Sequence, residues 1–222
     1  MNNQMPEIII EEIELTDKLP TKDAMLYPRE EGKTLVQDNQ MVSYREHLSR
    51  KNRMVFLTGP ISDDSESCNL LMALSSISDE PLKMIVTSPG GYLDATYMFC
   101  DTMKMIMEKT PIYVLGRYVC SAAVLPFVCA KKRYLLPHAK MMLHLPWGQI
   151  QGDTKEIEIQ RKEMEKTQSQ MVEFLRENGV RKSVKQIMLD IDREKWMNPQ
   201  EAIDYGLADE IMNPDVMKEW LS

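Results

Sequence analysis

Short apolar runs alternate with longer amphipathic segments from Arg53 onward, and this alternation limits the possible folds more than any other feature. Helical periodicity covers residues 65–77, 92–109 and about 153–177, and another helix is expected to start near Ser121. The runs that predict buried strands cover residues 54–58, 83–88, 112–116, 133–136 and 140–144, with Pro137 between the last two. Strands that alternate with helices predict an α/β fold in which most strands pair in parallel.

The first 50 residues differ from the rest of the chain. They are rich in charged residues and proline, and they lack sustained periodicity. We expect residues 1–50 to form an N-terminal arm that is partly mobile, and residues 51–222 to form one domain. A chain of 222 residues is long enough for a domain with a sizeable core plus such an arm.

The charge of the chain excludes some classes of partner. The net charge is −7, from 27 basic and 34 acidic residues, and nucleic acid and anionic membranes both require a basic face. No apolar run approaches the ~18 residues that span a bilayer. The N-terminus also lacks the basic start and long apolar stretch of a signal peptide. We therefore expect a cytoplasmic protein with neither nucleic acid nor a membrane as its partner.

The cysteines and histidines argue against a metal site. The four cysteines have no C-x-x-C spacing and lie in apolar surroundings, so we expect buried free thiols in a reducing compartment. None of the three histidines has a zinc-like partner four residues further on. No metal and no cofactor is expected.

The segment Ser88-Pro89-Gly90-Gly91 ends one predicted strand and precedes a helix. Paired glycines let the backbone turn tightly and approach a ligand, with N–H groups that point into a cleft. An ordinary strand-to-helix turn has the same composition, so this segment alone does not identify a binding site.

A thiol and a hydroxyl lie side by side at Cys120 and Ser121, where a helix is expected to begin. A nucleophile at that position gains from the positive potential and from backbone donors, although serine is also a common N-cap. A cysteine nucleophile needs a lowered pKa and access, and Val119 indicates packing instead, which favours Ser121. His144 ends an apolar run before a Pro/Gly turn, which suits a base at the rim of a sheet or a core histidine.

Taken in order, these segments resemble the proteolytic subunit of Clp protease from about Arg53 to Met212. The motifs that carry the resemblance are Phe56-Leu57-Thr58-Gly59, Ser88-Pro89-Gly90-Gly91 with Asp101-Thr102-Met103, Lys132-Arg133-Tyr134-Leu135-Leu136-Pro137, Met142-x-His144-x-Pro146, Gly152 with Glu156-Ile157-Glu158-Ile159, and Asp192-Arg193-Glu194 with Glu201-Ala202 and Tyr205-Gly206-Leu207-Ala208-Asp209. Each motif is weak alone, but their shared order is specific. The resemblance implies a ClpP/crotonase-like α/β fold of repeated β-β-α units that form a head, with a projecting long helix at residues 153–177.

The resemblance also implies a serine peptidase site. It assigns the nucleophile to Ser121 and the general base to His144, 23 residues further on. It assigns the oxyanion-hole donors to the backbone N–H groups of Gly91 and Ala122, with Gly90 shaping the turn. This is the arrangement for acyl transfer.

Three features depart from the family's pattern. The family's small residues that flank the serine are bulky here, at Tyr118 and Val119, or a thiol, at Cys120. The family's acidic residue is normally an aspartate after arginine, and that position is Glu194 here, with Asp190 and Asp192 as alternatives within one helical turn. The family has four positions from a glycine to the serine, whereas Gly116 to Ser121 is five.

For the whole molecule, the resemblance implies a chamber of stacked heptameric rings in which the long helix packs between rings. A Clp-type AAA+ unfoldase would hydrolyse ATP and feed unfolded polypeptides to the chamber, so the chain itself needs no cofactor. The sequence leaves open whether the arm is a propeptide, an axial segment or a docking segment. The alternatives are a catalytically inactive ring subunit and an acyl-CoA enzyme of the crotonase type.

Overall fold

The computed structural model describes residues 34–37, 40–43, 51–62 and 66–221. The chain divides into two compact units, Met1–Tyr44 and Arg45–Ser222. In the first unit, β1 (Thr34–Gln37) and β2 (Gln40–Ser43) form an antiparallel hairpin. The rest of the arm expected at residues 1–50 lies outside the described residues, so its mobility stays a prediction.

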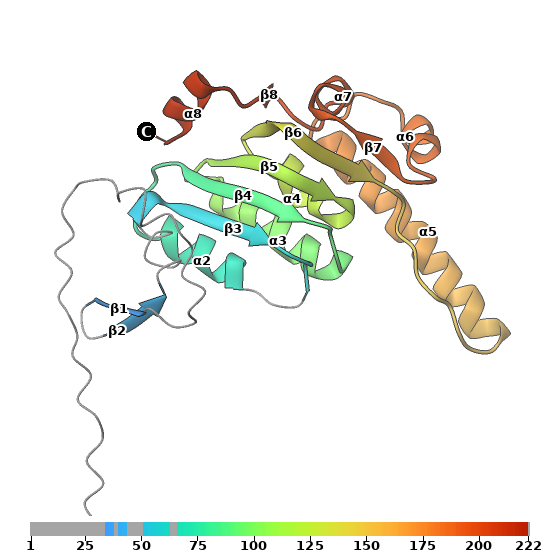
Figure 1. The fold of residues 1–222 in the computed structure, drawn as a ribbon. Coiled ribbons are helices and arrows are strands. Elements are labelled where there is room, and N and C mark those ends of the chain that lie inside the picture. The colour runs from blue at the N-terminus through green and yellow to red at the C-terminus, as the bar shows by residue number, and fades with distance from the viewer. Residues whose placement is uncertain (1–33, 38–39, 44–50, 63–65, 222) are drawn as a thin grey trace, which may run out of the picture. The chain divides into compact units, whose positions relative to one another are not determined.

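A six-stranded sheet forms the centre of the second unit (Figure 1). Its strand order is β3-β4-β5-β6-β7, and β8 pairs with β6. The pairs from β3 to β6 are parallel, whereas β7 is antiparallel to β6. These strands are β3 (Met54–Thr58), β4 (Leu82–Ser88), β5 (Ile112–Cys120), β6 (Lys132–Leu143), β7 (Lys195–Met197) and β8 (Glu210–Ile211). The predicted α/β fold with mostly parallel pairing is confirmed.

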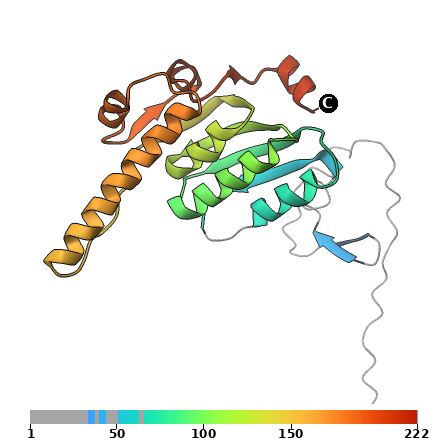
Figure 2. The same ribbon diagram turned by 180° about the vertical axis from the view of Figure 1, so that it is seen from behind.

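Helices α2, α3 and α4 cover one face of the sheet, as Figures 1 and 2 show. The main hydrophobic core lies between this helical layer and the sheet. A smaller core around Tyr134, Met212 and Trp220 includes side chains of the C-terminal helix α8. The helices are α2 (Glu66–Ser75), α3 (Leu93–Ile106), the 3₁₀ turn η2 (Ser121–Ala123), α4 (Val124–Cys129), α5 (Thr154–Glu177), α6 (Val184–Asp190), α7 (Pro199–Tyr205) and α8 (Pro214–Leu221).

The strand β6 differs from its prediction. The sequence predicts two strands broken at Pro137, but β6 runs continuously from Lys132 to Leu143. The break is in the pairing instead, because Leu135 is the partner of Gly116 and the next partner on β6 is Lys140, opposite Tyr118. Pro137 lies in this unpaired stretch, where its missing N–H costs no ladder hydrogen bond.

The extra residue expected before Ser121 is accommodated inside β5. Val86 on β4 is the partner of Gly116, and the next residue, Thr87, is the partner of Tyr118. Arg117 therefore forms a β-bulge and is exposed. The end of β5 keeps its pairing with β4 and β6 beyond the bulge.

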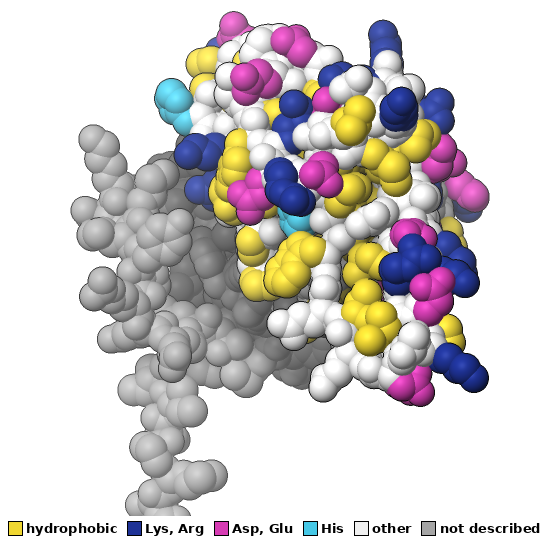
Figure 3. Space-filling model, turned by 90° about the vertical axis from the view of Figure 1, so that its right-hand side faces the viewer, with side chains coloured by type: hydrophobic (Ala, Val, Ile, Leu, Met, Phe, Trp, Pro, Cys, Tyr) yellow, Lys and Arg dark blue, Asp and Glu magenta, His cyan; other side chains and the backbone are white. Residues whose placement is uncertain are grey.

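Helix α5 is 24 residues long and begins with a capping box, in which the Asp153 and Glu156 side chains each accept from the other residue's N–H. The apolar residues Ile157, Met164, Met171 and Phe174 recur along this helix at heptad-like spacing, and their burial differs between its two halves. Met171 and Phe174 are buried in the main core, in the sheet and helices that we call the head, whereas Ile157 is exposed on the half of α5 that extends beyond the sheet in Figure 1. Figure 3 views the molecule from the right-hand side of Figure 1 and shows hydrophobic side chains exposed between charged ones. Within the described residues, no helix has the length and apolar composition to cross a membrane.

Candidate active site

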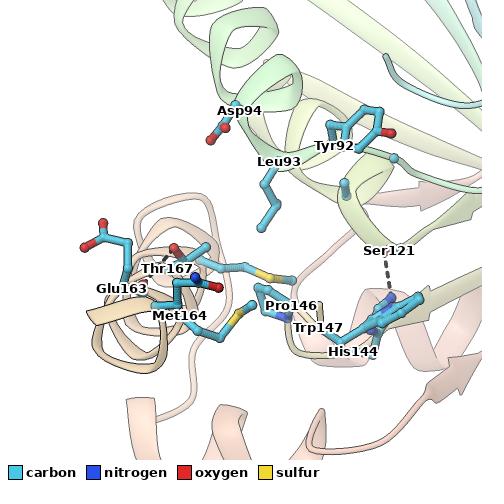
Figure 4. Close-up of a pocket in the computed structure, with 14 residues that line it drawn as sticks. Tyr92, Leu93, Asp94, Ser121, His144, Pro146, Trp147, Glu163, Met164 and Thr167 are labelled. Carbon is cyan, nitrogen blue, oxygen red and sulfur yellow. Dashed lines mark hydrogen bonds between the residues drawn. The ribbon is translucent and has the colours of Figure 1, made fainter. Parts of the chain in front are cut away.

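Ser121 and His144 lie together at the ends of neighbouring parallel strands. Ser121 follows β5 and His144 follows β6, so both side chains emerge at the same edge of the sheet. Ser121 Oγ and His144 Nε2 are 2.7 Å apart and form a hydrogen bond, drawn as the dashed line in Figure 4. This pairing meets the distance needed for a base to take a hydroxyl proton.

The backbone of Ser121 adopts a conformation that is rare for a side-chain-bearing residue. Its φ angle is 55°, in the left-handed region. The residue before it, Cys120, is still extended, whereas Ser121 itself begins η2, which is followed by α4. The sharp reversal presents the hydroxyl at the top of the strand, and strained backbone of this kind is characteristic of functional sites.

The Gly90–Gly91 turn packs directly against this reversal. A β-carbon on Gly90 would lie 2.7 Å from the Cys120 carbonyl oxygen and 2.8 Å from the Ala122 nitrogen. Gly90 also has a φ of 94°, and its N–H donates to Ser88 Oγ over 3.1 Å. A glycine is therefore required here both for conformation and for close approach.

The N–H of Gly91 points away from the neighbouring segment at Ile61. Ile61 N–H donates to the Gly90 carbonyl, and Ile61 C=O accepts from Tyr92 N–H. Because the C=O and N–H of one trans peptide point in opposite directions, the Gly90 carbonyl that faces Ile61 turns the Gly91 N–H away from it. Gly91 lines the same cavity as Ser121.

Ala122 supplies a second backbone donor next to the hydroxyl. It is the second residue of η2, so its N–H has no acceptor within the helix. Ala122 lines the cavity with Gly91 and Ser121. The two N–H groups predicted to hold an oxyanion are thus brought to one site around the hydroxyl.

The imidazole of His144 is held on its other side by a backbone carbonyl. Nδ1 lies 2.8 Å from the carbonyl oxygen of Leu145. A carbonyl only accepts, so this contact assigns the proton to Nδ1 and leaves Nε2 free to accept from Ser121. Leu145 is itself fixed, because its N–H donates to the Ile191 carbonyl over 2.8 Å.

The structure does not bring Glu194, the predicted acidic residue, to His144. Glu194 Oε2 accepts from the indole N–H of Trp196 over 2.9 Å. The alternative Asp190 accepts from Lys182 and Tyr205, and Lys182 is the main cause of its lowered pKa. The other alternative, Asp192, is exposed and lies 3.5 Å from Arg193 Nη1. Within the described residues, the hydrogen bonds of His144 go to Ser121 and Leu145.

Cys120 is a packed residue beside the site. Its side chain is buried, and burial is the main cause that raises the pKa of its thiol. A raised pKa disfavours the thiolate, which is the reactive form. Cys68, Cys100 and Cys129 are also buried, and all four cysteines are free thiols.

A cavity of about 390 Å³ opens beside Ser121 and His144. Figure 4 shows Leu93 and Met164 extending toward the middle of this cavity. Leu93 comes from the first turn of α3, directly after the Gly90–Gly91 turn, and Met164 comes from the middle of α5. The cavity is therefore formed between the head and the long helix.

The sequence patterns did not identify the residues that shape this cavity or the Leu145 carbonyl that orients His144. The cavity residues on α5 follow the Glu156–Ile159 motif in the chain, but the helical periodicity of α3 and α5 does not show which face of one helix lies opposite the other. One signal was available for α3, because a helix that starts directly after a glycine turn must present its first turn to the same cleft.

Comparisons with known proteins identify the family of the chain. The model of the Clp protease family matches residues 37–215. The chain is 34% identical over 167 residues to ATP-dependent Clp protease proteolytic subunit 3 of Rhizobium etli, which covers 73% of this chain and 84% of the relative. It is 35% identical over 166 residues to proteolytic subunit 2 of Pseudomonas aeruginosa, with 73% and 82% covered. A solved ClpP1 mutant from Listeria monocytogenes matches with a TM-score of 0.70 at 30% identity, over 80% of this chain and 99% of that one. The chain therefore belongs to the Clp protease family.

Proposed function

We propose that this chain is the proteolytic subunit of an ATP-dependent Clp protease and cleaves peptide bonds as a serine endopeptidase. The observation that carries the proposal is the 2.7 Å hydrogen bond between Ser121 Oγ and His144 Nε2. The backbone N–H groups of Gly91 and Ala122 line the same cavity, and the curated relatives in Rhizobium etli and Pseudomonas aeruginosa are named proteolytic subunits.

In the proposed reaction, Ser121 Oγ attacks the carbonyl carbon of the scissile bond while His144 Nε2 takes the hydroxyl proton. The negative charge that develops on the carbonyl oxygen is stabilised by the N–H groups of Gly91 and Ala122. His144 then gives its proton to the leaving amine, and the acyl group remains on Ser121. A water molecule, deprotonated by His144, releases the acyl group and restores the hydroxyl.

The orientation of His144 rests on the Leu145 carbonyl in this proposal. That carbonyl fixes the tautomer, but it carries only a partial charge and stabilises the imidazolium less than a carboxylate does. Glu194 remains the predicted acidic residue, and to reach His144 its carboxylate must leave the indole of Trp196. We expect the site to be active without that rearrangement and faster with it.

The proposed partners follow from the family. The chain would assemble with copies of itself into stacked heptameric rings, and a Clp-type AAA+ unfoldase would deliver unfolded polypeptides to the chamber. The exposed apolar residues on the outer half of α5, Ile157 and Ile159, support a surface that packs against another copy.

A covalent probe tests the nucleophile. A fluorophosphonate is expected to label the purified protein at Ser121, and Ser121→Ala should abolish both labelling and the cleavage of a fluorogenic peptide. Cys120→Ala is the matched control, because it alters the neighbouring buried side chain and should keep the label. Labelling at Cys120, found by peptide mass spectrometry, would contradict the proposal.

A second candidate function is a catalytically inactive ring subunit. The observation that favours it is that no carboxylate of the described residues hydrogen-bonds to His144. It predicts normal assembly with no peptide cleavage by the isolated protein. If cleavage is found, Glu194→Gln, Asp190→Asn and Asp192→Asn show which carboxylate contributes: a loss confined to Glu194→Gln identifies Glu194 as the acidic residue.

A further inference from the structure

The peptide that orients His144 is connected to the end of α6. The ladder between β6 and β7 ends at Leu143, so Leu145 lies beyond it. Leu145 N–H donates instead to the Ile191 carbonyl over 2.8 Å. Because the Leu145 carbonyl accepts from His144 Nδ1, the direction of the imidazole depends on where Ile191 lies.

Ile191 directly follows Asp190, the last residue of α6, whose carboxylate accepts from three donors. Asp190 Oδ2 accepts from Lys182 Nζ over 2.8 Å and from the Tyr205 hydroxyl over 3.1 Å. Its Oδ1 accepts from Gln186 Nε2 over 2.8 Å. We call these four side chains, Lys182, Gln186, Asp190 and Tyr205, the Asp190 cluster. Both carboxylate oxygens are used inside it, and among the described residues no hydrogen bond or ion pair joins Asp190 to His144.

The donors of the Asp190 cluster connect α6 with α7, which lie next to each other in Figures 1 and 2. Lys182 precedes α6, and Gln186 lies in its first turn. Tyr205 is the last residue of α7 and belongs to the main core. Lys182 Nζ also lies 4.5 Å from the centre of the Tyr205 ring. The Asp190 side chain is only 16% exposed, so its charge-assisted hydrogen bonds tie the end of α6 to a residue of the core.

We propose that Asp190 is a positioning residue for His144. The inference rests on the proposed peptidase function. The Asp190 carboxylate holds the end of α6 against α7, so that the Ile191 carbonyl keeps the Leu145 N–H in place. The Leu145 carbonyl in turn holds the Nδ1 proton of His144, which leaves Nε2 directed at Ser121 Oγ. Without the carboxylate the end of α6 can shift, and the imidazole loses this direction.

Asp190→Asn tests the proposal in the full chain. The amide keeps the shape of the side chain but has one accepting oxygen instead of two, so at least one donor of the cluster loses its acceptor. We expect kcat for a fluorogenic peptide to fall about tenfold with KM unchanged, because the base is misdirected while the substrate cleft is intact. The loss is smaller than the ~100-fold that a 1 Å displacement can cost, since the buried Ile191 side chain still anchors this segment.

Tyr205→Phe is the second variant, because it keeps the carboxylate and the buried ring and removes one donor. It should lower kcat about threefold with KM unchanged, as for the loss of one hydrogen bond among several. The matched control is Asp204→Asn, which makes the same amide change at an exposed carboxylate of α7 that accepts from Gln200 over 2.9 Å. Its kcat should equal that of the wild type.

In each variant, kcat is counted per serine that a fluorophosphonate labels at completion, so unfolded or unassembled protein does not enter the comparison. A wild-type kcat in Asp190→Asn overturns the inference. A loss of activity that lies in KM instead of kcat also overturns it, because a misdirected base does not weaken substrate binding.

A spectroscopic measurement separates this inference from the proposed function. The chain has three histidines, so solid-state nuclear magnetic resonance with ¹⁵N-labelled histidine can resolve the Nδ1–H signal of His144, assigned by its absence in His144→Gln. If the wild type cleaves no peptide, the peptidase proposal fails, but loss of this signal in Asp190→Asn and its retention in Asp204→Asn still support the positioning role. A wild type without the signal, or an unchanged signal in Asp190→Asn, overturns it.

Discussion

Gly90 is the residue on which the geometry around Ser121 most directly depends. Its φ of 94° and its contacts with the Cys120 carbonyl and the Ala122 nitrogen leave no room for a side chain. We predict that Gly90→Ala lowers peptidase activity at least about 100-fold, since a displacement near 1 Å at a reacting group has that effect. Activity and thermal unfolding of the variant would be measured together.

Gly59→Ala is the control for this prediction. Gly59 also has a positive φ, 79°, but a β-carbon there would meet no atom within 4 Å. Its substitution should cost only the left-handed strain, about 1–2 kcal/mol, and leave the activity of the folded protein intact. Equal losses of activity in the two variants would show that Gly90 acts through conformation alone, and not through its contact with the Ser121 turn.

The resemblance to Clp protease predicted the pairing of Ser121 with His144, but nothing in the sequence predicted what orients the histidine. Both residues follow strand-like runs, and the ends of neighbouring parallel strands meet at one edge of a sheet. The Leu145 carbonyl could not be predicted, because every residue has a carbonyl and only the turn after β6 decides which one faces Nδ1. The family motif identified Glu194 as the predicted acidic residue, but the motif does not show where its side chain points. In the structure its carboxylate accepts a hydrogen bond from the Trp196 indole.

At the scale of elements, Arg133 connects β6 with three other parts of the fold. It pairs with Asp209 before β8, and its Nη1 donates to the carbonyls of Asn178 after α5 and Gly206 after α7, over 2.9 and 3.1 Å. Its side chain is only 13% exposed. We predict that Arg133→Met lowers the free energy of unfolding by about 1–3 kcal/mol, because the part-buried carbonyls of Asn178 and Gly206 lose their donor.

Arg176→Met is the comparison for Arg133→Met. Arg176 pairs with Glu173 one helical turn away, and both side chains are about half exposed, at 45% and 51%. Its loss should cost no more than about 0.5 kcal/mol. Chemical denaturation of both variants measures the difference, and similar losses would show that the contacts of Arg133 do not hold the elements together.

Strands and helices with strong periodicity could be predicted from the sequence, whereas β6 could not. The apolar pattern predicted the bounds of β3 and missed only the first residue of β4, because each strand coincides with a short, uninterrupted apolar run. On β6, Pro137 indicates a break in the strand, but a proline breaks the ladder only where its N–H is needed. Because β6 does not pair with β5 between Leu135 and Lys140, the N–H that Pro137 lacks is not needed there, and the strand continues through this proline.

For the whole molecule, the response to alkali depends on tyrosines inside the fold. Burial is the main cause that raises the pKa of Tyr97 to about 12, and its hydroxyl has no hydrogen-bond partner among the residues that the structure describes. Between about pH 10 and 12 the unfolded chain releases this proton while the folded chain keeps it, so stability falls as pH rises. We predict that Tyr97→Phe, which keeps the ring packed edge-on to Phe174, makes the melting temperature less sensitive to pH above 9.

Melting curves from pH 8 to 11 measure this effect. At neutral pH the Tyr97→Phe variant should be as stable as the wild type or about 1 kcal/mol more stable, because an unpaired buried hydroxyl is removed. Tyr92→Phe, which removes a hydroxyl from a side chain that is 69% exposed, should keep the wild-type slope. A wild-type slope in Tyr97→Phe would mean that this tyrosine ionises as easily in the folded chain as in the unfolded one.

The size of the assembly is predicted to depend on the outer half of α5. Ile157 and Ile159 are 43% and 67% exposed on a segment that the head does not cover. Replacing both with lysine should shift the protein to smaller species in size-exclusion chromatography with light scattering, because charges would be buried between copies. Ile77→Lys, at a site 69% exposed beyond α2, is the control. An unchanged mass in the double variant would contradict packing through this helix.

The bulge at Arg117 shifts the phase of β5. Side chains of a regular strand alternate between its two faces, so Val114 and Val119, five residues apart, would lie on opposite faces. Both instead belong to the main core, because the extra residue exchanges the faces beyond Gly116. Val119, near the end of β5, is therefore buried in the main core. Val119 and Cys120 pair with Met141 and Met142 of β6, directly before Ser121. The extra residue therefore lies in the bulge before the nucleophile, and the pairing of β5 with β4 and β6 continues through Val119 and Cys120.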